Sequence, residues 1–178
     1  RSHLSLILKK WVADNPKADG SRYNIYTDGL KIYTTIDYEL QKAAEQAVRE
    51  HMIKLQKQFD SHWKGREPWK QDPMMARKEI RESKRYKSLA DKGIAEDEIL
   101  RQLKIPGKMR IYEAGEEKDI KLSPLDSVIH HFAMLQAGLL SMESKSGFVK
   151  AWVGGINYKY FKYDHVTSRR QAGSTFKP

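Results

Sequence analysis

The sequence predicts an α+β fold in which an antiparallel sheet packs with helices and carries a helical insertion. Two apolar runs with strand character, residues 140–143 and 148–153, flank the turn-forming segment SKSG. Stretches with an apolar period of 3.6 residues begin at the capping residues Asp37 and Ser123. Residues 60–105 are polar and helical in pattern, so we expect them to form an insertion outside the sheet.

The N-terminal third is predicted to hold a short helix, a strand and a long helix. Residues 4–12 form the short helix, and the alternation of Leu30, Ile32 and Thr34 with polar residues predicts the strand. Asp37 is expected to cap a helix over residues 38–57. The buried stripe predicted for this helix and its extension consists of Leu40, Ala44, Ala47, Val48, Leu55 and Phe59.

The middle third is predicted to form two helices and a β-hairpin. Asp72 followed by proline begins a helix that Gly93 ends, and residues 94–103 make a second helix. Apolar residues on either side of residues 115–118 then predict a hairpin with its turn there. We interpret this insertion as a structural spacer rather than a binding lobe.

A further helix begins at Ser123 and is expected to end at Gly138. Leu125, Val128, Ile129, Phe132 and Leu135 line one of its faces. His130 and His131 are neighbours, about 100° apart around the axis, which does not suit joint binding of a metal. We interpret both histidines as packing or surface residues.

Composition and charge exclude several classes of protein. With no cysteine among 178 residues, disulfides and thiolate metal sites are excluded, and no stretch approaches the ~20 apolar residues of a membrane span. The net charge of +10 makes nucleic acid and anionic surfaces candidate binding partners. Acidic residues are interleaved with the basic ones, as in residues 77–85, and no nucleic-acid motif frames the aromatic residues. We therefore expect no specific binding of nucleic acid.

Two segments match the pattern S-x-x-K, which places a lysine one helical turn from a serine so that the amine can activate the hydroxyl. Ser174 and Lys177 follow Gly173, which permits a sharp turn, and an apolar strand ends upstream at residues 154–155. Ser61 and Lys64 lie in a polar run without a preceding strand, which is typical of a solvated helix end. Ser174 is therefore the candidate nucleophile and Lys177 the candidate base.

Three blocks in this order resemble the class A penicillin-binding proteins, bifunctional enzymes that polymerise and cross-link peptidoglycan. Residues 29–37 (GLKIYTTID), followed by LQKAAE at 40–45, resemble the opening of their transpeptidase region. Residues 146–155 (SGFVKAWVGG) resemble the strand ahead of the nucleophile, and 170–178 (RQAGSTFKP) resemble the nucleophile block. Ala172 stands where the family usually has proline, a departure that affects the loop and not the chemistry.

The resemblance implies that the sheet is the start of a penicillin-binding transpeptidase domain. We expect residues 1–22 to be the tail of a preceding region, 23–59 the strand and helix that open the transpeptidase region, 60–122 the insertion and 123–178 the front of the catalytic domain. The start at Arg1, without methionine, and the end one residue after Lys177 suggest part of a longer polypeptide.

The resemblance also implies a chemistry. Ser174 would attack the penultimate D-alanine of a stem peptide ending in D-alanyl-D-alanine, Lys177 would accept its proton, and β-lactams would acylate the same serine. No metal or organic cofactor is implied. A glycosyltransferase domain would precede Arg1, and the whole protein would be anchored on the extracytoplasmic face of the cytoplasmic membrane, in the periplasm of the envelope.

The sequence also allows two other interpretations. The chain could be a non-catalytic basic module that binds wall polymer, anionic lipid or a partner protein. A serine β-lactamase shares S-x-x-K but lacks the block TTID found at residues 34–37, so it ranks well behind.

The 178-residue chain alone is expected to form no stable acyl-enzyme. It contains neither the S-x-N nor the K-T-G segment that a serine acyl-enzyme of this kind also needs, and the second of these would complete the oxyanion hole. The check is incubation with a fluorescent penicillin followed by a denaturing gel. A labelled band that depends on Ser174 would contradict this expectation.

Overall fold

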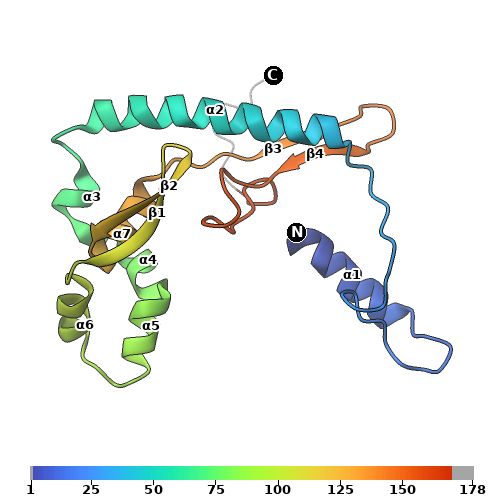
Figure 1. The fold of residues 1–178 in the computed structure, drawn as a ribbon, viewed down its shortest axis with the longest axis horizontal. Coiled ribbons are helices and arrows are strands. Elements are labelled where there is room, and N and C mark those ends of the chain that lie inside the picture. Colours follow the sequence, from blue (N-terminus) through green and yellow to red (C-terminus); the bar gives the residue numbers. More distant parts are fainter. Residues whose placement is uncertain (1, 170–178) are drawn as a thin grey trace. The chain divides into compact units, whose positions relative to one another are not determined.

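The computed structural model describes residues 2–169, and residues 1 and 170–178 lie outside that description. The chain divides into two units at the boundary between Thr35 and Ile36. The second unit contains almost all of the regular structure and every contact discussed below for the candidate site (Figure 1).

The first unit consists of helix α1 (Ser2–Asp14) and an irregular segment. The Trp11 ring lies 5.6 Å from that of Tyr23, and an ion pair joins Lys17 to Asp28 at 2.7 Å. The predicted short helix is confirmed. The strand predicted over residues 30–34 is wrong, since no strand is assigned there and Tyr33 is 90% exposed. An alternating pattern forms a strand only where a neighbouring strand can pair with it.

Helix α2 (Tyr38–Trp63) is the longest element of the second unit. Its predicted cap is confirmed, because Asp37 Oδ1 accepts a hydrogen bond of 3.0 Å from the backbone N–H of Leu40. The predicted stripe is only partly right. Val48 and Met52 are the buried residues of α2, whereas Leu40, Ala47 and Leu55 are exposed. Val48 and Met52 are buried because they lie on the face of α2 that packs against Val153 of strand β4.

Four short α-helices and one 3₁₀ helix follow α2, as the pattern of residues 60–105 predicts. They are α3 (Pro68–Gln71), the 3₁₀ helix η1 (Pro73–Ala76), α4 (Arg77–Glu82), α5 (Lys84–Ala90) and α6 (Glu96–Leu103). Asp72 caps the start of η1, with its carboxylate 2.9 Å from the N–H of Met74. The single helix predicted between Asp72 and Gly93 is broken at Ser83, whose hydroxyl accepts from Tyr86 N–H and donates to the Ile80 carbonyl.

These helices enclose a core with helix α7 (Pro124–Ala133). The buried members are Trp69, Ala76, Ile80, Ile99, Leu103, Leu125 and Ile129. The ring of Phe59 on α2 stacks on that of Trp69 at 5.3 Å, so the end of α2 is tied to the same core. Ser123 caps α7 as predicted, but the helix ends at Ala133 and not at Gly138.

Strands β1 (Gly107–Glu113) and β2 (Glu116–Leu122) form the predicted β-hairpin. Its turn is Ala114-Gly115, earlier than the predicted residues 115–118, and both residues have positive φ, 51° and 88°. The tip lies on α2, because a Cβ at Gly115 would come within 2.5 Å of Ile53 Cδ1. Arg49 also donates a hydrogen bond of 3.0 Å to the Gly115 carbonyl.

Strands β3 (Leu139–Met142) and β4 (Val149–Val153) form the second hairpin, close to the predicted bounds. They pair antiparallel with Leu139 opposite Val153. The described residues thus give a mixed α+β fold with two small antiparallel hairpins. Among residues 2–169, no helix combines the length and the apolar character that crossing a membrane requires.

Replacing Ile80, which is 1% exposed, with alanine should lower the free energy of unfolding by about 2–5 kcal/mol. The loss arises because the core of α3–α7 cannot close fully around the missing atoms. Ile105→Ala is the matched control, since Ile105 is 66% exposed and should change the same quantity by no more than about 0.5 kcal/mol. Urea denaturation measures both, and equal losses would contradict the position assigned to this core.

Candidate functional site

The structure describes one of the two S-x-x-K matches and not the other. Ser174 and Lys177 lie outside the described residues, so their roles stay predictions. Ser61 lies in the last turn of α2 and Lys64 caps its C-terminal end, and both are exposed. The interpretation of Ser61 and Lys64 as a solvated helix end is confirmed. The candidate site is therefore built from strand β4 and residues 154–169, which lead along the chain to the nucleophile block.

The start of α2 covers the outer edge of β4. The backbone N–H of Asp37 donates to the carbonyl of Lys150 at 2.9 Å. The Gln41 side chain then pairs with the Trp152 backbone, accepting from its N–H at 2.7 Å and donating to its carbonyl at 3.1 Å. A glutamine amide offers the same donor and acceptor as a peptide group, so α2 takes the place of a neighbouring strand. Strand β4 is thus held on both edges.

Asp164 holds the loop that leaves β4. Its Oδ2 accepts a hydrogen bond of 3.0 Å from the indole N–H of Trp152, and its Oδ1 accepts one of 3.0 Å from the backbone N–H of Val166. The N–H of His165 donates to the carbonyl of Gly154 at 2.8 Å. Hydrogen bonds to a carboxylate are stronger than neutral ones, and these are partly buried. They fold residues 155–165 back onto the end of β4.

Two glycines allow this close return. A Cβ at Gly154 would lie 2.9 Å from Asp164 Oδ1, closer than a carbon can approach without displacing the carboxylate. A Cβ at Gly138, ahead of β3, would lie 3.0 Å from the backbone of His165 and Val166. The absence of a side chain at both positions lets the loop pack against both strands of the second hairpin.

Aromatic rings fill the space beside the loop. Tyr160 stacks on Tyr112 of strand β1 with centroids 5.6 Å apart, and Phe161 lies 5.1 Å from the ring of His131 on α7. Burial, and next the charge of His130, lower the pKa of the His131 imidazole below its usual value, so it is neutral at pH 7. His130 Nε2 lies 3.0 Å from the Tyr112 carbonyl. The prediction that both histidines are packing or surface residues is confirmed.

A separate cavity of about 850 Å³ lies among α2, α3, α7 and the first hairpin. Its floor is apolar, with Ile53, Ile111 and Leu125 among its residues, and its rim carries both lysines and carboxylates. The mixture of charges favours no one class of ligand. Within residues 2–169, no three side chains of His, Asp or Glu gather closely enough to hold a metal ion.

Sequence reasoning missed three residues that position this region: Gln41, Gln56 and Asp164. Both glutamines fall in the same phase of α2 as the buried Val48 and Met52, a signal that a polar residue there needs a buried partner. No sequence pattern marks Asp164, because its partners, Trp152 and Val166, come near it only when the loop folds back.

Comparisons with known proteins agree on one family. Residues 64–135 match the family described as penicillin-binding protein middle domain. The chain is 27% identical over 169 residues to penicillin-binding protein 1A of Aquifex aeolicus, which covers 86% of this chain and 22% of the relative. Over 86% of this chain it is also 24% identical to penicillin-binding protein 1A of Pseudomonas aeruginosa and 28% identical to that of Neisseria lactamica, covering 22% and 23% of these relatives. No solved structure gives a significant match.

Gly154→Ala should loosen the loop, because the new Cβ would displace the Asp164 carboxylate that holds Val166. Amide hydrogen exchange at His165 and Val166 is expected to become faster. Gly107→Ala is the matched control, since Gly107 lies at the start of β1 with no atom within 4 Å of the position of its Cβ. Unchanged protection of Val166 in the Gly154→Ala protein would mean that the loop does not depend on this close approach.

Proposed function

Since the chain is homologous to a portion of the class A penicillin-binding proteins and contains their middle domain, we propose that it includes the front of a D,D-transpeptidase that cross-links peptidoglycan. The observation that carries the proposal is the fixed strand and loop ahead of Ser174. Strand β4 is held by α2, and Asp164 folds the following residues back onto it, directly before the S-x-x-K pair in the sequence.

In this reaction Ser174 is the nucleophile. Its hydroxyl oxygen attacks the carbonyl carbon of the penultimate D-alanine, the peptide bond to the terminal D-alanine breaks, and the departing amine takes up a proton so that D-alanine leaves as the free amino acid. Lys177 takes the serine proton and must therefore be neutral at the moment of attack. The backbone N–H of Ser174 stabilises the oxyanion. The acyl group then passes to an amine of a neighbouring stem peptide. β-Lactams acylate the same serine because they mimic the D-alanyl-D-alanine terminus.

The proposal extends to the complete protein. The chain spans about 22% of the length of the curated relatives that it matches. The proposed division has residues 23–59 opening the transpeptidase region, 60–122 as the insertion and 123–178 as the catalytic front. The complete protein would also carry a glycosyltransferase and act at the extracytoplasmic face of the cytoplasmic membrane. The S-x-N and K-T-G elements would come from parts of it other than these 178 residues.

The alternative function, a non-catalytic basic module, is supported by the net charge of +10 alone. In the described residues, some of the basic side chains are paired with nearby carboxylates. Arg110 binds Asp119, Arg81 binds Glu96 and Lys159 binds Glu117. This local pairing leaves a mixed surface, so the charge favours the alternative less than the sequence total suggests.

In the complete polypeptide, Ser174→Ala should abolish acylation by a β-lactam. Lys177→Ala should slow acylation by about 10²–10⁴-fold and leave the fold nearly intact, because it removes the proton acceptor. Ser61→Ala is the matched control: Ser61 is exposed at the end of α2, so acylation should be unaffected and stability should change by no more than about 0.5 kcal/mol. Mass spectrometry of the penicillin adduct locates the modified serine. An adduct on Ser61, or full acylation of the Ser174→Ala protein, would refute the assignment.

A further inference from the structure

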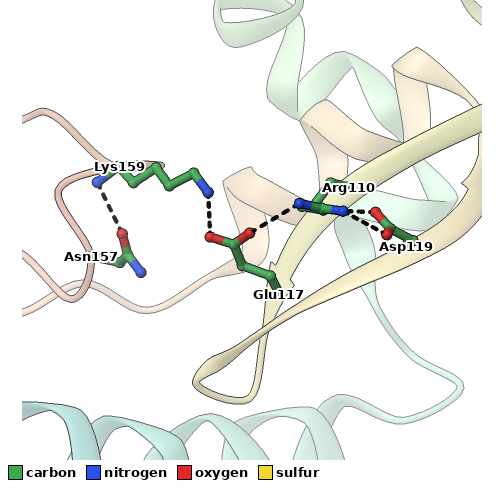
Figure 2. A network of polar contacts seen from close by, with 5 residues as sticks. All are labelled: Arg110, Glu117, Asp119, Asn157 and Lys159. Carbon is green, nitrogen blue, oxygen red and sulfur yellow. Dashed lines mark hydrogen bonds and ion pairs between the residues drawn. The ribbon is translucent and has the colours of Figure 1, made fainter.

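The first hairpin, β1–β2, touches the loop that leads to Ser174. The hairpin lies within residues 64–135, the part that matches the middle domain, whereas the loop belongs to the proposed catalytic front. Figure 2 shows the polar half of this contact. The ammonium of Lys159 lies 2.5 Å from Glu117 Oε1 on β2. Two segments 42 residues apart in sequence therefore meet through a direct ion pair.

Glu117 is itself held in place by its own hairpin. Its Oε2 lies 3.7 Å from Arg110 Nη1, and Arg110 also makes two hydrogen bonds, of 2.7 and 2.8 Å, with the carboxylate of Asp119 (Figure 2). The hydrogen bond from Lys159 is the largest cause that lowers the pKa of the Glu117 carboxyl, so this group is ionised at neutral pH. The loop lysine thus meets a carboxylate whose position is already restricted.

An aromatic contact lies beside the ion pair. Tyr112 of β1 is 6% exposed and stacks with Tyr160 at 5.6 Å, while Phe161 approaches the edge of the same ring at 6.3 Å. The ammonium of Lys159 lies 5.5 Å from the centroid of the Tyr160 ring, so the two loop residues form one unit. Exposed ion pairs are weak and screened by salt, whereas stacked rings are not screened. The stacked rings therefore provide most of the attraction between loop and hairpin, and the ion pair determines which position of the loop is favoured.

The loop can transmit this contact toward the nucleophile block. Asn157 closes a turn around Lys159, since its side chain accepts from the Lys159 N–H at 2.9 Å and its carbonyl accepts from the Phe161 N–H at 2.8 Å. The ring of Tyr163 then packs on His165 at 4.9 Å, next to the Asp164 hydrogen bonds that hold Val166. Each link is a local contact, and together they join the hairpin to the last described residues before the S-x-x-K pair.

We propose that the β1–β2 hairpin is a clamp that positions the loop of residues 157–166, and through it Ser174, for acylation. Glu117, Lys159 and Tyr160 are then positioning residues, which act on the reaction through the loop and do not touch the substrate. This inference rests on the proposed function of Ser174. It also assigns the insertion a role in positioning, beyond that of a spacer.

The test uses the complete polypeptide and the second-order rate constant for acylation by a fluorescent penicillin. Lys159→Glu should lower this constant about two- to fivefold, the range expected for loss of an exposed ion pair. Tyr160→Ala should lower it by up to about tenfold. In a double-mutant cycle, Glu117→Gln and Lys159→Gln should each lower the constant, and the double variant should lose little more than either single variant, because both substitutions remove the same ion pair. Lys162→Glu is the matched control, with the same charge change in an exposed residue of the same loop.

Amide hydrogen exchange of the peptide covering residues 157–166 provides a readout that is independent of catalysis. Exchange should be faster in Lys159→Glu and Tyr160→Ala and unchanged in Lys162→Glu. The clamp is refuted if Lys159→Glu matches the wild type in both measurements, if Lys162→Glu has the same effect, or if the effects of Glu117→Gln and Lys159→Gln simply add in the double variant. A wild-type protein that is not acylated at Ser174 would refute the proposed function, and the exchange data alone would then decide whether the hairpin holds the loop.

Discussion

Two glutamine side chains on α2 hold the rest of the second unit in place. Gln41 pairs with the backbone of Trp152, and Gln56 pairs in the same way with the N–H of Leu135 at 2.9 Å and the carbonyl of Ala133 at 3.4 Å. Because a glutamine amide reproduces the donor and acceptor of a peptide group, Gln41 satisfies the free edge of β4, and Gln56 satisfies backbone groups at the C-terminal end of α7. The two glutamines lie about 22 Å apart along the helix. One helix therefore holds both strand β4 and the segment that leaves α7.

The first hairpin depends on the same helix. Its tip rests on Ile53, and Arg49 donates to the carbonyl of Gly115 in the turn. Helix α2 thus holds both strand β4 and the hairpin, independently of the contact between the hairpin and the loop. This shared support raises the effective concentration of Glu117 at Lys159, so an ion pair that would be negligible between separate molecules can select one position of the loop.

Local signals in the sequence were sufficient for most of the elements, and tertiary contacts decided the rest. The caps at Asp37 and Ser123 are predictable because the carboxylate or hydroxyl bonds to backbone only three residues away. The strand predicted over residues 30–34 fails because alternation says nothing about a pairing partner, and the described structure supplies none there. The role of Asp164 could not be read from the sequence, since its partners come from a strand and from the returning loop. The S-x-x-K pair at 174 and 177 lies outside the described residues and stays a prediction.

The contacts that position the loop differ in how they respond to the solvent. The amide pairs of Gln41 are partly buried, and so are the hydrogen bonds of Asp164, which makes both insensitive to ionic strength. The ion pair of Glu117 with Lys159 is exposed, and salt screens it, while the stacked ring of Tyr160 continues to adhere. The loop is therefore held firmly where Asp164 bonds it to β4, and less firmly at the turn around Lys159. Because the contact with the β1–β2 hairpin is the one that salt weakens, we expect a change in the hairpin to alter the outer turn of the loop and to leave strand β4 in place.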